Sequence, residues 1–334
     1  MPRGDLSRAE AAVMEAAELS GLLVPGRPVL VLLSGGRDSV CLLDVAVRLA
    51  GADVVGALHV NYGLREAAVA DERHCADLCA ALGVALTVER ARPPGSGNLQ
   101  AWARDVRYGA AAALALGDGA LVATGHTATD QAETVLYRLA ASPGRRALLG
   151  MSPRDGRLVR PLLEVSRDQT GAYCLARGLA WRDDESNATD RYARGRVRSG
   201  LLPALSAIHP AAEANVIQTA RLLRDEAVVL DAAVDEVLAG AAEIDVARLA
   251  GLSPALARLV VRRLAEDAAG RPAALVTRRL DDLLALADRP GGAALDVGAG
   301  LRAHVACGVL RFAPLPRAED RSPPAAWHLA DDPA

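Results

Sequence analysis

A short segment rich in serine and glycine, Ser34–Ser39 with the sequence SGGRDS, carries the clearest chemical signal in the chain. It directly follows the apolar run at residues 28–33 and precedes a helical pattern at residues 40–49. A buried strand that turns through glycines into a helix start presents backbone N–H groups and hydroxyls around a small concavity, which suits a phosphate group. The alternative is an ordinary turn, in which the glycines supply positive φ and a serine caps the helix.

Two common phosphate loops are excluded by the sequence. A Walker A loop requires a lysine, which the chain lacks entirely, and the segment does not have the G-x-G-x-x-G spacing of dinucleotide folds. The S-G-G-x-D-S pattern instead resembles the PP-loop of the N-type ATP pyrophosphatases, which split ATP into AMP and pyrophosphate while adenylating a substrate. This resemblance implies ATP contacts from Ser34, Gly35, Gly36, Arg37, Asp38 and Ser39.

A second group of polar residues lies at the end of the apolar run at residues 54–60. His59 and Asn61 would reach the same sheet edge as the phosphate loop, where they could contact the base or the ribose of a nucleotide. The alternative is structural, because a histidine between apolar neighbours can be satisfied within its strand and an asparagine can form the following turn.

A third group follows the apolar run at residues 120–124 and begins with His126. Asp130 and Glu133 are three residues apart, so a helix would project both carboxylates from one face of its first turn. Such a pair suits a divalent metal or proton transfer. Acidic residues in a first turn also cap a helix and are favoured by its dipole, so both interpretations stay open.

The sequence around these groups predicts the scaffold. From residue 28 to about residue 180, short apolar runs alternate with helical patterns, which indicates a doubly wound, mainly parallel α/β sheet covered by helices on both faces. Ligands of such sheets gather at the carboxyl ends of the strands. Strands are expected at residues 29–33, 54–60, 85–89, 120–124 and 157–160, and helices at 38–50, 67–82, 98–116, 130–140 and 165–178.

We predict four parts along the chain. An N-terminal helix (1–27) precedes the α/β domain (28–190), and a smaller helical domain (191–313) ends in a short hairpin. The segment 314–334 is expected to be a disordered tail, since it is rich in proline and aspartate.

The composition narrows the class of protein. A net charge of −3 does not by itself indicate a nucleic-acid partner, although residues 187–224 hold six arginines and only two acids. The five cysteines form no C-x-x-C pair, so neither a disulfide framework nor a standard zinc site is indicated. No apolar run approaches the roughly 20 residues of a membrane span, so we expect a cytoplasmic protein without a membrane partner.

Taken in order, the motifs resemble the bacterial tRNA(Ile)-lysidine synthetase family. Its members carry S-G-G-x-D-S, H-V-x-H-G-L-R and G-H-x-x-D-D-Q-x-E-T at successive strand ends. Ala103–Tyr108 is similar to the A-R-x-x-R-Y helix of that family, and Arg194–Arg198 to its R-N-R-[IVL]-R run. The chain departs from the pattern at Tyr62 and Thr127, where histidines are usual, and at Thr129, where the first of two adjacent aspartates is usual.

The resemblance implies a reaction and roles for residues. The family replaces the C2 oxygen of the wobble cytidine in the isoleucine tRNA with a CAU anticodon by the amine of free L-lysine, using ATP and Mg²⁺, and a homodimer is expected. Asp38 and Asp130 would hold the metal, and Asp130 or Glu133 would accept the lysine proton. The implied catalytic residues are Asp38, Arg104, Asp130 and Glu133; the implied further nucleotide contacts are His59, Asn61, Arg107 and His126; the implied tRNA contacts are Arg191, Arg194, Arg196 and Arg198.

Two alternatives remain. Another PP-loop enzyme, such as a tRNA thiolase, would be expected to carry cluster cysteines, which are absent. The second alternative is a noncatalytic relative that binds a nucleotide or tRNA. Thr127 and Thr129 suggest it, because they replace a usual histidine and a usual aspartate in the third motif.

Overall fold

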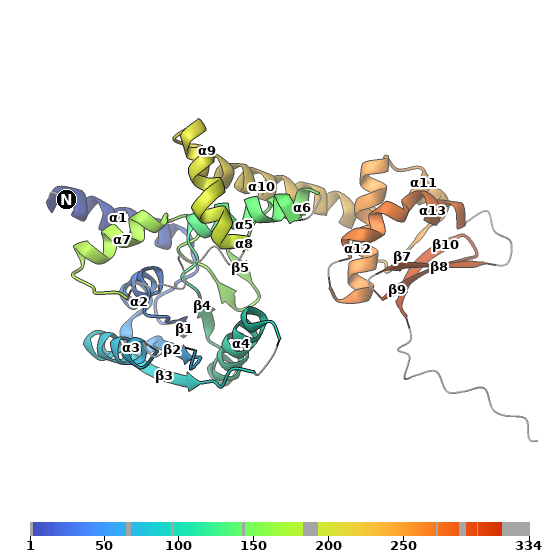
Figure 1. The fold of residues 1–334 in the computed structure, drawn as a ribbon. Helices are drawn as coiled ribbons and strands as arrows, with labels where there is room; N and C mark the ends of the chain where they lie inside the picture. Colours follow the sequence, from blue (N-terminus) through green and yellow to red (C-terminus); the bar gives the residue numbers. More distant parts are fainter. Residues whose placement is uncertain are drawn as a thin grey trace, which may run out of the picture. The chain divides into compact units, whose positions relative to one another are not determined.

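The computed structural model describes residues 3–64, 68–94, 97–141, 144–182, 193–271, 273–286, 292–298 and 300–315. By their contacts, these residues divide into two compact units, within Met1–Arg224 and Asp225–Ala334. Figure 1 shows the elements of each unit. Among the described residues, no helix combines the length and the apolar character that crossing a membrane requires.

A six-stranded sheet with the order β3-β2-β1-β4-β6-β5 lies at the centre of the first unit (Figure 1). Every neighbouring pair is parallel except β5 with β6. Because β1 pairs with β2 on one side and β4 on the other, the winding direction changes at β1, as predicted for a doubly wound sheet. The strands are β1 (Val29–Leu32), β2 (Val55–Asn61), β3 (Ala85–Arg90), β4 (Leu121–Ala123), β5 (Arg154–Asp155) and β6 (Leu158–Val159).

Helices cover both faces of this sheet because its strands are apolar on both sides. Val29 and Val31 of β1 belong to a core with α1, α2, α3 and α7, whereas Leu30 and Leu32 pack on the opposite face with α4. The five strands and five helices predicted between residues 28 and 180 are all present. The helices are α1 (Arg3–Leu19), α2 (Arg37–Ala50), η1 (Ala52–Val54), α3 (Ala68–Leu82), α4 (Leu99–Asp118), α5 (Ala128–Ala141), α6 (Arg145–Leu148) and α7 (Arg167–Ala176).

The chain beyond residue 192 first returns to this unit. It forms α8 (Ala193–Arg196), the π-helix η3 (Val197–Leu201), α9 (Leu202–Ile208) and α10 (Ala212–Leu238). Val197 and Leu202 form an apolar cluster with Ala132 and Leu136 of α5. This packing explains why contacts assign residues up to Arg224 to the first unit, beyond the end predicted at residue 190.

The second unit combines helices with a sheet. An apolar core joins α12 to a four-stranded antiparallel sheet with the order β7-β10-β9-β8. The three strands after residue 292 were anticipated as a hairpin, but β7 was not, because three residues are too few to show a period. Its elements are β7 (Glu243–Asp245), α11 (Val246–Ala250), α12 (Pro254–Ala269), η4 (Ala274–Arg279), α13 (Leu280–Ala285), β8 (Ala293–Gly298), β9 (Leu301–Ala306) and β10 (Val309–Pro314). Of the predicted tail, residues 316–334 lie outside the described residues.

A buried polar network fastens α2 to α7. Asp44, which is 1% exposed, accepts hydrogen bonds from the Tyr173 hydroxyl at 2.6 Å and from Nε of Arg177 at 3.0 Å. Arg48 donates to the Tyr173 oxygen at 3.2 Å and to Glu10 of α1 at 2.7 Å. Burial and the bond to Asp44 raise the pKa of Tyr173, so the hydroxyl stays protonated and remains a donor.

We expect Tyr173→Phe to lower the free energy of unfolding by about 1–3 kcal/mol, because the buried Asp44 carboxylate then loses a hydrogen-bond donor. Urea denaturation followed by circular dichroism measures the change. Tyr137→Phe is the matched control, since Tyr137 on α5 is 38% exposed, and it should alter stability by no more than about 0.5 kcal/mol. Equal effects of the two variants would contradict the importance of the network.

Candidate active site

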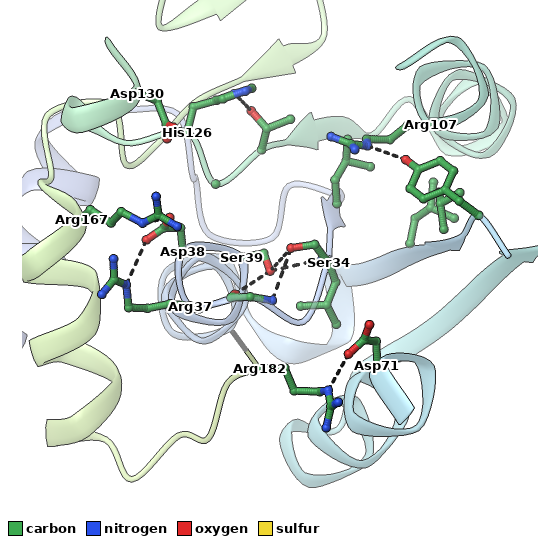
Figure 2. Close-up of a pocket in the computed structure, with 18 of the residues that line it drawn as sticks. Ser34, Arg37, Asp38, Ser39, Asp71, Arg107, His126, Asp130, Arg167 and Arg182 are labelled. Atoms are coloured by element: carbon green, nitrogen blue, oxygen red, sulfur yellow. Dashed lines mark hydrogen bonds and ion pairs between the residues drawn. The ribbon is translucent and has the colours of Figure 1, made fainter. Parts of the chain in front are cut away.

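A cavity of about 500 Å³ opens where β1, β2 and β4 end (Figure 2). One part of its wall is apolar and is formed by Leu32, Leu58 and Val60. The remainder is polar, and its charged side chains come from the chain segments that follow the strands: Arg37, Asp38, Asp71, Arg107, Asp130, Arg167, Arg182 and Arg198. The cavity therefore lies at the switch point of the sheet, where the fold class predicts a ligand.

The predicted phosphate loop is held in shape by its own serines. The Ser39 hydroxyl donates to the Gly36 carbonyl at 2.8 Å and accepts from the Ser34 amide at 3.1 Å, and the two hydroxyls are 3.0 Å apart. Gly35 has φ +84°, a conformation that other residues rarely adopt. Within the described residues no side chain caps α2 at Gly36, which leaves its first amides for a bound anion.

A second close approach brings the end of β4 against the start of α2. A Cβ atom added to Gly125 would lie 2.9 Å from the carbonyl oxygen of Asp38. A larger residue at position 125 would therefore push the two segments apart. This glycine explains how the third motif comes to share one cavity with the phosphate loop.

Asp38 lies among three polar partners. Its Oδ1 accepts a hydrogen bond from the Thr170 hydroxyl at 2.5 Å, and Nε of Arg37 and Nε of Arg167 each lie 3.6 Å from one of its oxygens. Burial raises the pKa of the Asp38 carboxyl, with the Thr170 bond and Arg167 acting in the opposite direction. The negative charge of Asp130, which lines the same cavity, raises the pKa of Asp38 further.

Asp130 fulfils the capping interpretation and also lines the cavity. Its Oδ2 accepts hydrogen bonds from the amide and the hydroxyl of Thr127, both at 2.9 Å. Its Oδ1 lies 3.8 Å from Nη2 of Arg198. Thr127, which replaces the usual histidine, thus orients this carboxylate.

Glu133 and Arg198 form a pair that the sequence did not predict. Glu133 is 2% exposed, and its two oxygens accept hydrogen bonds from Nε and Nη2 of Arg198 at 2.5 and 2.9 Å. This bond raises the pKa of Arg198, which stays charged. Arg198 lines the cavity and Glu133 does not. Arg198, which was predicted to contact the tRNA, therefore lines the cavity. Glu133, which was predicted to act in catalysis, binds the Arg198 guanidinium through both of its carboxylate oxygens.

Four other predicted site residues are not among those that line the cavity: Gly35, His59, Asn61 and Arg104. The buried His59 ring contacts the Leu33 carbonyl at 2.9 Å through Nδ1, and the Asn61 amide donates to Glu72 at 3.0 Å. The structural interpretation of both residues therefore accounts for their contacts. Arg104 on α4 is exposed, and its guanidinium carbon lies 4.8 Å from the centre of the Tyr108 ring.

His126 and Arg107 do reach the cavity, as predicted. Nδ1 of His126 is 2.8 Å from the Thr124 hydroxyl, and Nε of Arg107 donates to the Tyr62 hydroxyl at 2.9 Å (Figure 2). These contacts hold both side chains at the strand ends.

Five residues at the site had no predicted role there: Tyr62, Asp71, Arg167, Thr170 and Arg182. Nε of Arg182 contacts Asp71 at 2.5 Å, and the Arg182 amide donates to the Gly35 carbonyl at 3.0 Å (Figure 2). Arg167 in Ser166–Arg167 and Arg182 in Trp181–Asn187 lie in stretches similar to the S-R and W-x-x-D-P-S-N stretches of the family that the motifs resemble. This similarity could have indicated both arginines. Asp71 and Thr170 sit within helical patterns and gave no signal.

The predicted tRNA contacts are only partly described. Arg191 lies outside the described residues, Arg194 is described only as part of α8, and Arg196 is exposed on α8. Among the described residues, no group of three or more histidine, cysteine, aspartate or glutamate side chains could hold a metal.

Known proteins resemble this chain over most of its length. Residues 9–205 match the family described as a PP-loop domain. The chain is 43% identical over 280 residues to tRNA(Ile)-lysidine synthase of Salinispora arenicola, covering 78% of this chain and 82% of the relative. It is 40% identical over 332 residues to tRNA(Ile)-lysidine synthase of Symbiobacterium thermophilum, covering 90% of this chain and 68% of the relative.

A solved structure supports the fold. The U34-tRNA thiolase NcsA from Methanococcus maripaludis matches with a TM-score of 0.55 at 16% identity, covering 66% of this chain and 80% of the thiolase. At 16% identity, this similarity supports a shared fold and does not extend to the activity.

Proposed function

Because the chain belongs to the tRNA(Ile)-lysidine synthase family of PP-loop proteins, we propose that it joins free L-lysine to C2 of the wobble cytidine of an isoleucine tRNA, at the expense of ATP. The observation that carries this proposal is the cavity at the switch point, where the Ser34–Ser39 loop, Asp38 and Asp130 meet. We also propose that this isoleucine tRNA is the one with a CAU anticodon. A cytoplasmic location and a homodimer remain proposals that rest on the family resemblance.

The reaction needs two steps because an amide-like oxygen is a poor leaving group. In the first step the C2 oxygen attacks the α-phosphorus of ATP, and pyrophosphate leaves. In the second step the neutral amine of lysine attacks C2, AMP leaves with the oxygen, and a proton is released. The protein must therefore bind pyrophosphate, stabilise charge on the phosphoryl group and hold the amine close to C2.

The polar part of the cavity fits the phosphate chain. The amides at the start of α2 and the loop hydroxyls would bind the phosphates that leave, and Arg37, Arg167 and Arg198 supply positive charge around them. Glu133 would keep the Arg198 guanidinium in one orientation, since it engages two of its nitrogens. Oriented charge of this kind acts without reorganisation during the reaction.

The carboxylates of the cavity fit a magnesium ion. Asp38 and Asp130 both line the cavity, and a bound cation would relieve the repulsion between their negative charges. Mg²⁺ is commonly held by one or two carboxylates together with substrate phosphates, so no third protein ligand is required. When bound there, the ion would neutralise phosphate charge.

The tRNA-binding surface is proposed to include the arginines around α8. Arg191, Arg194 and Arg196 lie close to Arg198 in the sequence, and Arg198 lines the cavity. Arginine side chains of this segment would hold the RNA backbone while the target base enters the cavity.

We expect radiolabelled lysine to enter an isoleucine tRNA transcript with a CAU anticodon when ATP and Mg²⁺ are present. AMP should form in equal amount, because one adenylate is consumed per lysine added. The control is the methionine tRNA with the same anticodon, which should remain unlabelled. AMP formation without label would favour another PP-loop enzyme, and binding of ATP and tRNA without turnover would favour a noncatalytic relative.

A further inference from the structure

Aromatic residues are scarce in this chain, with five tyrosines, three tryptophans and one phenylalanine among 334 residues. Two of them nevertheless meet at the edge of the cavity. Tyr62 follows the end of β2 and Trp102 lies in the first turn of α4, and their ring centres are 5.8 Å apart at an angle of 66°. An edge-to-face pair of this kind stabilises the orientation of both rings.

The Tyr62 ring is held by three kinds of contact. Its hydroxyl donates to the Ala103 carbonyl at 3.2 Å and accepts from Nε of Arg107 at 2.9 Å. The guanidinium carbon of Arg107 also lies 5.9 Å from the ring centre, within the range of a cation–π contact. Together with the contact to Trp102, these interactions orient the ring before any ligand arrives.

This oriented ring lines the cavity beside its apolar wall. Leu32, Leu58 and Val60 line the same cavity, and Leu32 and Leu58 are register partners in β1 and β2. The phosphate loop begins two residues after Leu32. A ligand with phosphates in the loop would therefore share the cavity with the Tyr62 ring and these apolar side chains.

We propose that Tyr62 is a stacking platform for a nucleobase, and that Trp102 and Arg107 are positioning residues that keep its ring in place. Aromatic rings and arginine planes are the surfaces on which bases stack, and stacking tolerates any base because each has a π-face. The base is either the adenine of ATP or the target base of the RNA. The second source rests on the proposed function, whereas the first requires only a PP-loop nucleotide site.

The test compares Tyr62→Leu, which removes the aromatic face, with Tyr62→Phe, which keeps it. Calorimetry measures the binding of a non-hydrolysable ATP analogue and of inorganic tripolyphosphate, which has no base. If adenine stacks on Tyr62, Tyr62→Leu weakens the binding of the ATP analogue by about 10–100-fold and leaves the binding of tripolyphosphate unchanged. Tyr62→Phe retains most of the affinity for the analogue. Tyr137→Leu is the matched control, on α5 and outside the residues that line the cavity.

A second experiment measures the binding of two RNA transcripts. They are identical except that the wobble nucleotide is intact in one and lacks its base in the other. If the target base stacks on Tyr62, the wild-type protein prefers the intact transcript and Tyr62→Leu loses this preference, while binding of the ATP analogue is unchanged. The proposal is overturned if Tyr62→Leu changes neither the binding of the ATP analogue nor the preference for the intact transcript. It is also overturned if Tyr62→Leu weakens the binding of tripolyphosphate as much as the binding of the analogue. None of these measurements requires lysine transfer, so they can fail or succeed independently of the proposed reaction.

Discussion

ATP–pyrophosphate exchange by Asp38→Asn is expected to fall by about 10²–10³-fold. Asparagine keeps the shape of the side chain and removes its charge, so the loss would report the electrostatic role of Asp38 toward metal-bound phosphate. The variant should fold at least as well as the wild type. Burial raises the pKa of Asp38, which means that the ionised carboxyl is destabilised in the folded protein at neutral pH.

Asp53→Asn is the matched control for this prediction. Asp53 is exposed in η1, before β2 and therefore away from the carboxyl ends of the strands. Its replacement should leave exchange within about twofold of wild type, as is usual for a surface substitution. Wild-type exchange by Asp38→Asn would reject the assignment of Asp38 to the phosphate and metal site.

Arg198→Met is expected to reduce lysidine formation by about 10²–10³-fold and to destabilise the protein. The Glu133 carboxyl would remain buried without its guanidinium partner, and breaking such a pair typically costs about 3–5 kcal/mol. Thermal unfolding measures the stability, and lysine incorporation measures the activity. Arg258→Met, at an exposed position on α12, is the control and should change neither.

The double variant Glu133→Gln with Arg198→Met separates two roles for Glu133. If Glu133 acts only by holding Arg198, the double variant is no less active than Arg198→Met and is more stable, because the unpaired buried charge is gone. If Glu133 also accepts the lysine proton, the double variant loses a further factor of about 10² or more. A further loss of activity of that size would support the role of Glu133 as the base that accepts the lysine proton.

The scaffold was predictable because its signals are local. Apolar runs and helical periods extend over several residues, and each predicted strand and helix between residues 28 and 180 is present. The strand β7 escaped prediction because it depends on pairing with β10, more than 60 residues away, rather than on its own pattern. The end of the first unit was also set by tertiary packing, through Val197 and Leu202 on α5.

Within the site, the phosphate loop was predictable because it directly follows a strand, and Asp130 because it lies in the first turn of the helix that follows the next central strand, β4. Arg198 was not, because its arginine-rich surroundings read as a solvated or RNA-binding surface, and only the fold brings it to Glu133. His59 illustrates the opposite case. It occupies the expected strand end, but a period of two residues turns its ring into the interior, where its Nδ1 lies 2.9 Å from the Leu33 carbonyl oxygen.

The Glu133–Arg198 pair has a consequence for the order in which the protein becomes functional during synthesis. The chain leaves the ribosome from its N-terminus, so the sheet and the phosphate loop emerge well before residue 198. Until then Glu133 has no guanidinium partner and the cavity lacks one of its cations. We expect nascent chains ending near residue 182 to form the sheet without turning over ATP, so that nucleotide consumption begins only once the segment leading into the second unit has been made.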